Sequence, residues 1–359
     1  MSLRLGLLTG GGDAPGLNAV IRAVVRASAQ FGFECIGLED GFEGLRRPER
    51  ARPLALRDVA GIHRLGGTIL GTVNGGSPLG APGPLSGEAA QYAAQCVAGC
   101  RQLGLDAVIA IGGDGTLAIA HALHAQGIPM IGVPKTIDND IAETAMSFGF
   151  DSAVAFATES IDRLHSSADA HRRVMVIEVM GRYTGWIALA SAIAGGADVV
   201  LIPEIPFRYE RIVQRVRERA ALGARSSIVV AAEGAAPAGG SRVVAVPGDG
   251  GRQEKLGGIA ERVAAELQRA GTDARFDVLG HLQRGGPPTS VDRVLAARFG
   301  THAVELAQRG EFDVVVALRP PDIVAVPLAK VAGRTRTILP DSDLIRTARS
   351  LGISFAHGE

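Results

Sequence analysis

The sequence predicts an α/β protein built from two doubly wound, mainly parallel sheets. Short apolar runs alternate with segments whose apolar residues recur at helical spacing, which is the pattern of strands connected by helices. The runs show no polar alternation, as expected of strands covered on both faces. Glycine-rich turns recur in segments 10–17 and 112–117. Because ligands bind beyond the carboxyl ends of the strands in such sheets, these turns carry the most functional information.

Seven apolar runs are predicted as strands, and the amphipathic stretches between them, such as 17–25 and 259–267, as helices. The runs are residues 3–8, 107–111, 128–133, 174–179, 199–202, 228–232 and 314–318. Segments 41–53 and 235–251 are expected to be mobile surface loops, and the second is rich in glycine and proline.

The composition is that of an ordinary soluble enzyme, with 47% hydrophobic and 21% charged residues. The 37 basic residues balance 37 acidic ones, so no net field favours nucleic acid or an anionic membrane as a partner. The first residues lack the pattern of a secretory signal, and no apolar run approaches the length of a membrane span. Three cysteines argue against a disulfide framework and predict a reducing, cytoplasmic location. Cys96 and Cys100 are interpreted as buried free thiols because no further ligand stands at metal-binding spacing.

The first glycine turn, TGGGDAPGLN at 9–18, follows a predicted strand and precedes a predicted helix. Backbone N–H groups in such a turn approach a phosphate closely, and the helix dipole adds to the attraction. The second turn, IGGDGTL at 111–117, adds the carboxylate of Asp114, which suits magnesium on a polyphosphate, and the hydroxyl of Thr116. Glycine turns also make ordinary sharp connections, so these two indicate polyphosphate binding without naming the acceptor.

The segment VPKTIDND at 133–140 carries two carboxylates, Asp138 and Asp140, beside Lys135 and Thr136. Phosphoryl transfer needs a base for the acceptor hydroxyl, positive charge near the migrating group and strict alignment. This segment offers all three. The alternative is an ordinary Asx-rich turn at the end of a strand, which explains any one of these residues better than the whole string after GGDGT.

Five motifs together resemble, in order and spacing, the motif set of the 6-phosphofructokinase family. They are GGDAPG, GGDGT, PKTIDND, MGRYTGW at 180–186 and LGHLQRGG at 279–286. The resemblance implies transfer of the ATP γ-phosphoryl group to the 1-hydroxyl of fructose 6-phosphate, a step of glycolysis, with Mg²⁺ as cofactor. It also implies a homo-oligomer, dimer or tetramer, with shared active sites.

The resemblance assigns roles residue by residue. Asp138 would be the base, and Thr136 and Arg182 would stabilise the transferring group. Asp114 would position Mg²⁺, with Asp140 as a second catalytic carboxylate and candidate ligand. The implied donor-binding residues are Gly12, Asn74, Gly113, Asp114, Gly115, Thr116 and Lys135. The implied substrate-binding residues are Thr136, Asp138, Arg173, Met180, Gly181, Arg182, Glu233, Arg275, His281 and Arg284.

Two of these residues, Arg173 and Arg275, are implied to reach the substrate of a neighbouring subunit. Taken singly, each arginine has a commoner role in a surface ion pair, and His281 fits a satisfied core histidine equally well. The resemblance further implies two lobes with the reaction in the cleft between them. The phosphoryl-donor lobe would comprise 1–149 and about 284–335, the sugar-phosphate lobe 150–283, and a C-terminal helix or tail 336–359.

Two positions bear on the choice between ATP and inorganic pyrophosphate as donor. Family members that use pyrophosphate typically carry aspartate after the metal-binding aspartate, in the place of the nucleotide α-phosphate. Here that residue is Gly115, which leaves the place open and uncharged. Lys135 resembles the pyrophosphate users instead, and the combination resembles the mixed-substrate group of the family. ATP is the expected donor, and pyrophosphate is the alternative.

Three features depart from the family pattern. Asn74 stands where many relatives place an arginine near the terminal phosphate of the donor, which predicts weaker stabilisation there. Phe42 replaces a tyrosine near the nucleotide but keeps an aromatic ring. The effector pocket of the allosteric bacterial enzymes keeps Arg22 and Arg26. Its other basic positions read Leu56, His165, Leu222 and Ala224, which predicts insensitivity to nucleoside diphosphate and phosphoenolpyruvate.

Two other functions compete with this hypothesis. NAD kinases and lipid kinases also carry GGDGT in an α/β lobe, but they lack the PKTIDND and GHLQRGG strings. A non-catalytic sensor of sugar phosphate is suggested by Asn74 and opposed by Asp114, Asp138, Asp140 and Arg182, all of which are present.

Overall fold

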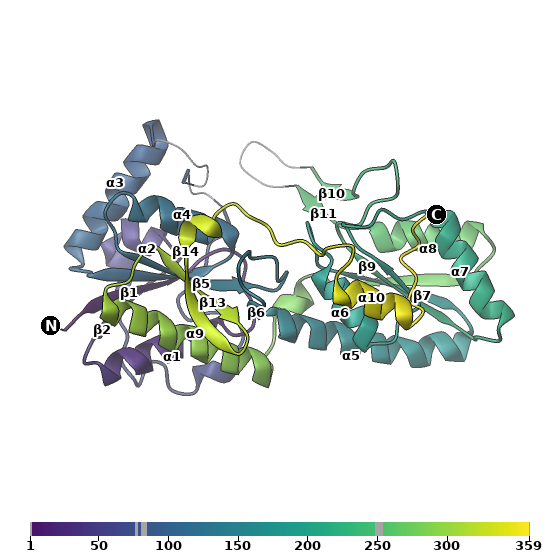
Figure 1. Cartoon of the computed structure of the whole chain (residues 1–359), viewed down its shortest axis with the longest axis horizontal. Coiled ribbons are helices and arrows are strands. Elements are labelled where there is room, and N and C mark those ends of the chain that lie inside the picture. Colours follow the sequence, from purple (N-terminus) through teal and green to yellow (C-terminus); the bar gives the residue numbers. More distant parts are fainter. Residues whose placement is uncertain (1, 76–77, 80–84, 248–253, 359) are drawn as a thin grey trace. The chain divides into compact units, whose positions relative to one another are not determined.

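The structure is a computed structural model that describes residues 2–75, 78–79, 85–247 and 254–358. The chain divides into two compact units, Met1–Ser152 with Arg284–Arg336 and Ala153–Gln283 with Thr337–Glu359. Each unit is an α/β body around a mainly parallel sheet (Figure 1), which confirms the predicted fold class. The sequence-based division at 149, 283 and 335 stays a prediction of functional lobes.

The first unit holds an eight-stranded sheet in the order β14-β13-β5-β4-β1-β2-β3, with β6 paired to β5. Among the described strands of this sheet, the pairs β13–β14 and β2–β3 are antiparallel and the others are parallel. The strands are β1 (Arg4–Thr9), β2 (Glu34–Leu38), β3 (Ala51–Pro53), β4 (Ala107–Gly112), β5 (Met130–Thr136), β6 (Phe148–Gly149), β13 (Val314–Arg319) and β14 (Asp322–Pro327). The central strands β1, β4 and β5 are almost fully buried, as their unbroken apolar runs require.

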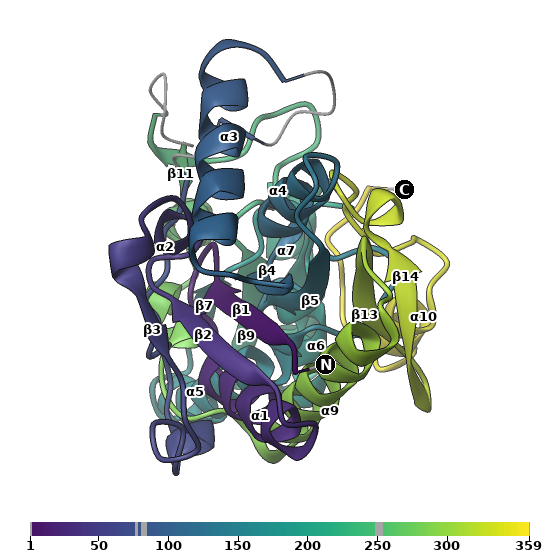
Figure 2. The ribbon, with the colours of Figure 1, turned by 90° about the vertical axis from the view of Figure 1, so that its left-hand side faces the viewer.

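Helices cover both faces of this sheet, as Figure 2 shows. On one face, α1 (Leu17–Gln30) and α9 (Ser290–Arg309) pack in a cluster with Leu5, Leu7 and Ile109. On the other face, α2 (Glu43–Arg46), α3 (Gly87–Gln102) and α4 (Asp114–His124) pack in a cluster with Leu8 and Val108. Successive strand residues enter opposite clusters because side chains alternate across a strand. The unit is therefore doubly wound.

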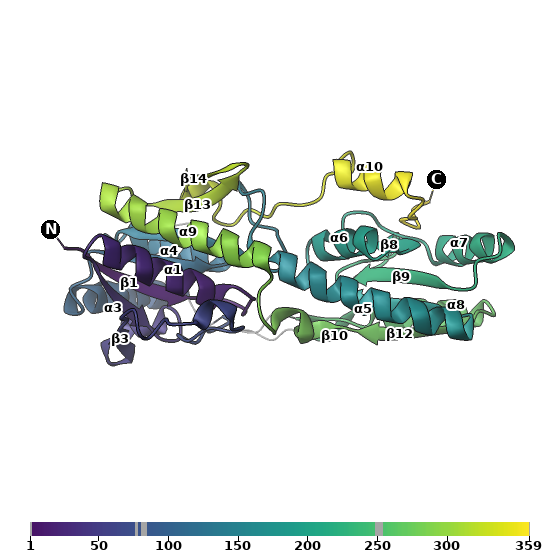
Figure 3. The same cartoon turned by 90° about the horizontal axis from the view of Figure 1, so that it is seen from below.

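The second unit holds a four-stranded, wholly parallel sheet in the order β12-β7-β9-β8. Its strands are β7 (Val174–Val179), β8 (Val199–Leu201), β9 (Ser227–Ala232) and β12 (Ala274–Val278), and β10 (Val244–Val246) pairs with β11 (Lys255–Leu256) in a separate ribbon. Its helices are α5 (Phe150–His171, which begins in the first unit), α6 (Trp186–Ala194), α7 (Tyr209–Ala221), α8 (Ile259–Arg269) and α10 (Asp343–Ser350). Helices α7 and α8 cover one face of the sheet, and α10 packs on α6 (Figure 3).

Four short 3-10 helices complete the described elements. They are η1 (Pro48–Arg50), η2 (Ile62–Arg64), η3 (Gly280–Arg284) and η4 (Leu328–Lys330). Within the described part of the chain, no helix combines the length and the apolar character needed to cross a lipid bilayer.

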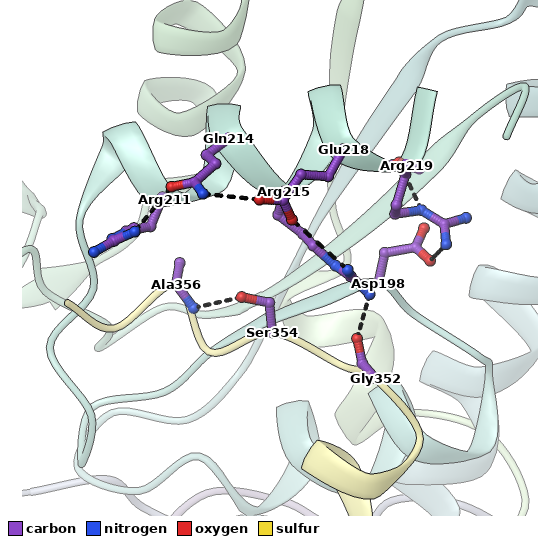
Figure 4. Close-up of polar contacts among 10 residues, drawn as sticks. Asp198, Arg211, Gln214, Arg215, Glu218, Arg219, Gly352, Ser354 and Ala356 are labelled. Carbon is purple, nitrogen blue, oxygen red and sulfur yellow. Dashed lines mark hydrogen bonds and ion pairs between the residues drawn. The ribbon is translucent and has the colours of Figure 1, made fainter. Parts of the chain in front are cut away.

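The C-terminal segment extends the sheet of the second unit at the edge formed by β8. Ser354 forms a parallel bridge with Val199, and its carbonyl accepts a hydrogen bond of 2.9 Å from Val200 N. Arg215 of α7 donates to the carbonyl of Gly352 at 2.6 Å (Figure 4). The segment predicted as a helix or tail is thus integrated into the second unit.

All seven predicted strands are present, as β1, β4, β5, β7, β8, β9 and β13. The expectation of a surface loop over 41–53 is wrong, because this segment forms α2, η1 and β3 and buries Phe42 and Leu45. The second expected loop contains β10, and its last residues, 248–251, lie outside the described residues. Cys96 and Cys100 are buried free thiols, as predicted.

Candidate active site

The first glycine turn connects β1 to α1 and lies against two other segments of the first unit. Thr72 donates its hydroxyl to Gly11 O at 2.5 Å, and Gly11 N donates to Val73 O at 3.2 Å. These bonds hold the exposed Asn74 beside the turn. A Cβ at Gly12 would lie 2.9 Å from Nη1 of Arg284, so glycine is what allows this guanidinium to approach the backbone.

The second glycine turn connects β4 to α4 and places Asp114 at the first residue of the helix. Thr116, which is buried, fills the space beside both turns. A Cβ at Gly112 would lie 2.3 Å from its hydroxyl oxygen, and one at Gly10 would lie 2.7 Å away. By contrast, a Cβ at Gly115 would meet no atom within 4 Å. The turns are packed together, while the position after Asp114 is open.

The third segment leaves the carboxyl end of β5 at Thr136, whose hydroxyl accepts a hydrogen bond of 3.1 Å from Asp138 N. Asn139 adopts a positive φ of 52°, and its side-chain oxygen accepts a bond of 3.1 Å from Ser147 N. Arg336 donates to Asn139 O at 2.6 Å, and its backbone N donates to Asp140 O at 2.7 Å. The turn is therefore held from three sides.

The carboxylates of these segments lie close enough to affect one another. Burial raises the pKa of Asp138, while the charges of Arg284 and Lys135 oppose the rise. Nη2 of Arg284 lies 3.9 Å from the Asp138 carboxylate. Burial, followed by the charges of Asp138 and Asp114, raises the pKa of Asp140 to about 7. The structure thus brings Asp114, Asp138 and Asp140 into one electrostatic environment.

Lys135 is buried in this same cluster and donates from Nζ to Gly12 O. Burial, assisted by the charge of Arg284, lowers its pKa to about 8. The nearby carboxylates of Asp13 and Asp138 work in the opposite direction. At neutral pH the ammonium form therefore predominates and supplies positive charge between the first turn and the third segment.

Magnesium suits this arrangement of donors. No group of three or more His, Cys, Asp or Glu side chains suited to a metal occurs among the residues the structure describes. Mg²⁺, however, is usually held by one or two carboxylates together with water and substrate phosphates. Burial, and after it the negative charges of Asp138 and Asp114, raise the pKa of Asp140, and a cation beside Asp114 and Asp140 would compensate that charge. The residues present fit the ion.

In the second unit, a further set of predicted residues gathers beyond the carboxyl ends of β7 and β9. Gly181 has φ 145°, and a Cβ there would lie 2.6 Å from Thr184 O, so the loop after β7 requires glycine. Glu233 N donates to Val179 O at 2.9 Å, which places Glu233 beside Met180. The side chain of Arg182 donates to Glu254 O.

Arg173 and Arg275 lie elsewhere in the second unit. Arg173 precedes β7, and Arg275 pairs with Met175 near the start of the neighbouring strand β12. At a rise of about 3.3 Å per residue, the length of β7 separates this pair by roughly 20 Å from Met180. One copy of the sheet therefore does not bring all the predicted sugar-phosphate residues together.

The last predicted residues lie around η3. His281 is exposed, so its interpretation as a satisfied core histidine is wrong. Arg284 belongs to the first unit, beside Asp138 and the carbonyl of Asp13, to which it donates at 3.1 Å. Sequence reasoning missed Arg336, Glu254 and Asp273 as supporting residues. None of them belongs to a recognisable motif. The contacts of Arg336 with Asn139, Glu254 with Arg182 and Asp273 with Arg173 all form between distant parts of the chain.

Comparisons with known proteins give a consistent result. The family described as phosphofructokinase matches residues 4–307. An ATP-dependent 6-phosphofructokinase of Chloroflexus aggregans is 53% identical over 98% of this chain and 97% of the relative. A pyrophosphate–fructose 6-phosphate 1-phosphotransferase of Amycolatopsis methanolica is 48% identical over 94% and 97%, respectively. The structure of Pichia pastoris phosphofructokinase in the T-state aligns over 92% of this chain with a TM-score of 0.82 and 29% identity, and the match spans 35% of that longer chain.

Proposed function

Because the chain belongs to the phosphofructokinase family, we propose that it is an ATP-dependent 6-phosphofructokinase. It transfers the γ-phosphoryl group of ATP to the 1-hydroxyl of fructose 6-phosphate. The observation that carries this proposal is the position of Asp138. Its carboxylate shares one environment with Lys135, Arg284 and Asp114 at the carboxyl ends of β4 and β5. An NAD or lipid kinase has no support from these matches.

The donor binds to the first unit in this proposal. Backbone N–H groups of the turns at Gly12 and Gly113 face the phosphates, and the N-terminus of α4 adds a favourable dipole. Lys135 supplies the positive charge that Asn74 lacks. Mg²⁺, held by Asp114 with Asp140, would neutralise the charge of the polyphosphate.

Asp138 acts as the base in this proposal. It accepts the proton of the sugar 1-hydroxyl as the oxygen attacks phosphorus, and the donor diphosphate leaves. Thr136 fixes the start of the turn through its bond with Asp138 N, so the carboxylate is oriented before substrate binds. The positive charges of Lys135 and Arg284 keep Asp138 able to ionise although burial opposes its negative form.

In this proposal the substrate-binding residues of the second unit bind fructose 6-phosphate, and Arg284 stays a predicted substrate-binding residue of the first unit. Glu233 accepts hydrogen bonds from sugar hydroxyls, and the loop of Met180, Gly181 and Arg182 lines the sugar. Arg182 also stabilises the transferring group. His281, exposed in η3, contributes a donor to the 6-phosphate.

Arg173 and Arg275 serve the 6-phosphate site of a partner subunit, so the enzyme is a homo-oligomer. Their separation from Met180 along β7 supports this proposal, since they lie too far away to join Glu233 in the same chain. Strand β12 also exposes apolar side chains, with Phe276 43% and Val278 52% accessible. A second copy of the chain would cover this apolar surface.

ATP is the proposed donor and pyrophosphate is the alternative. Identity does not decide, because relatives of both kinds are about equally similar to this chain. The open space beside Gly115 favours ATP, since nothing in the described chain occupies the place that an α-phosphate needs. Three buried free thiols support a reducing compartment, and we place the enzyme in the cytoplasm.

A coupled assay tests the proposal directly. Fructose 6-phosphate is offered with ATP or with pyrophosphate at equal Mg²⁺, and formation of fructose 1,6-bisphosphate is followed. We expect turnover with ATP and at least tenfold lower kcat/KM with pyrophosphate, roughly 1.4 kcal/mol in transition-state binding. Binding of fructose 6-phosphate without turnover with either donor would instead support a sugar-phosphate sensor.

A further inference from the structure

The carboxylate of Asp273 lies between two arginines that the proposed function assigns to the sugar phosphate. Its Oδ1 accepts a hydrogen bond of 2.6 Å from Nη1 of Arg275. Its Oδ2 lies 3.4 Å from Nε of Arg173. One acidic side chain therefore contacts the guanidinium of Arg275 in β12 and that of Arg173, the residue just before β7.

Strand pairing explains why these three residues meet. Strands β7 and β12 are parallel neighbours, with Ala274 opposite Val174. Asp273 and Arg173 are the residues immediately before these partners, and Val174 N donates to Asp273 O at 2.9 Å. The backbone of Asp273 is therefore fixed by the sheet, and its carboxylate begins from a defined position.

The contacts occupy only part of each guanidinium. A guanidinium has five N–H donors in a planar fork. Arg173 presents Nε to Asp273, while Arg275 uses Nη1 for both Asp273 and the carbonyl of Ala274, the latter at 2.8 Å. Nη1 and Nη2 of Arg173, and Nε and Nη2 of Arg275, have no other partner among the described residues. Paired donors of this kind bind a phosphate dianion well.

We propose that Asp273 is a positioning residue that holds Arg173 and Arg275 ready for the 6-phosphate of fructose 6-phosphate. This inference rests on the proposed function and deepens it. Without the carboxylate, two long side chains would have to be ordered each time substrate binds, which weakens binding. Losing a negative charge near the phosphate would by itself strengthen binding. This opposing effect is smaller, because Asp273 is 44% exposed and its charge is screened by water and salt.

The test is a set of steady-state measurements on the full-length enzyme. In Asp273→Asn, we expect KM for fructose 6-phosphate to rise about tenfold, as for two side chains that lose their orientation. The kcat and the KM for ATP should stay within about twofold of wild type, because neither arginine touches the reacting atoms. Asp273→Glu, which keeps the carboxylate, should recover most of the lost affinity.

Two controls make the result specific. Asp277→Asn removes an exposed carboxylate from the same strand, where no ion pair is present among the described residues, and should leave KM unchanged. In the double variant Arg173→Ala/Arg275→Ala, adding Asp273→Asn should change KM by less than about twofold, because its effect passes through the arginines. The oligomeric state of each variant is measured by light scattering.

The outcomes separate this inference from the function on which it rests. If wild-type enzyme does not phosphorylate fructose 6-phosphate, the proposed function fails first. If wild type is active and Asp273→Asn leaves KM unchanged or lowers it, the positioning role is wrong. A rise in KM that accompanies loss of the oligomer also contradicts the inference, since Asp273 would then act at a subunit contact.

Discussion

The two units organise their candidate residues in opposite ways. In the first unit, Asp114, Asp138 and Lys135 come from turns at the ends of adjacent strands and converge within one chain. In the second unit, Glu233 and Arg275 belong to different ends of one sheet. The cluster proposed for proton and phosphoryl transfer, with Asp114, Asp138 and Lys135, is thus complete within the first unit. The phosphate-binding set proposed for the second unit is split across a sheet, and in the proposed homo-oligomer a second copy would complete it.

The largest effect on activity is expected from replacing Asp138 in the first unit. Asp138→Asn removes the base but keeps the shape of the turn, so kcat should fall by about 10³-fold with KM for fructose 6-phosphate changed only a few-fold. Stopped-flow or coupled assays measure the rate. Asp322→Asn, an exposed carboxylate of the same unit, is the matched control. Retention of more than a tenth of the wild-type rate would remove Asp138 from the role of base.

The second prediction concerns Arg275, which lies far from Glu233 in the sheet of the second unit. Arg275→Ala should raise KM for fructose 6-phosphate by about 30-fold, since a charge-assisted hydrogen bond to phosphate is lost. Mixing this variant with Asp138→Asn and letting subunits exchange should restore activity, because each hybrid dimer then contains one site with both residues intact. A mixture no more active than the sum of its components would place Arg275 in the site of its own chain.

Some strands and site residues could be predicted from the sequence, and others could not. Seven strands of the two sheets and the carboxylates of the first unit could be predicted, because each depends on a contiguous run of residues. Strand β12 could not, since its exposed ARFDV sequence lacks an apolar run and becomes a strand only by pairing with β7. Arg336 is recruited to Asn139 across 197 residues of chain, and no local pattern marks such a contact. The failure over 41–53 has the same cause, because α2 is stabilised by packing against α3.

A smaller effect is expected at Gly115, the residue that bears on the choice of phosphoryl donor. Gly115→Asp should lower kcat/KM for ATP by about tenfold, because a carboxylate then occupies the open space needed by the α-phosphate. Gly115→Ala fills part of the same space without charge and should leave the rate close to wild type. Turnover with pyrophosphate, which has no α-phosphate, should be spared. Unchanged ATP kinetics in Gly115→Asp would refute the steric and electrostatic argument.

The smallest expected effect concerns regulation. Adding nucleoside diphosphate or phosphoenolpyruvate should shift the half-saturation concentration of fructose 6-phosphate by less than about twofold, because too few cations remain to bind these anions tightly. Arg22 and Arg26 are present, but Leu56 and Leu222 stand exposed where charge is expected, at 50% and 86% accessibility. Saturation curves recorded with and without each compound provide the measurement. A clear change in their midpoint or steepness would show that another cationic site compensates.

The pairing of Ser354 with β8 has a practical consequence for handling the protein. An uncovered strand edge is a template on which other chains can add and aggregate. Here the segment after α10 covers that edge through Ser354, which bridges to Val199 and whose carbonyl accepts a hydrogen bond from Val200 N. Truncating the last eight or so residues would expose β8 and favour insoluble material, and an affinity tag is therefore better fused to the other terminus.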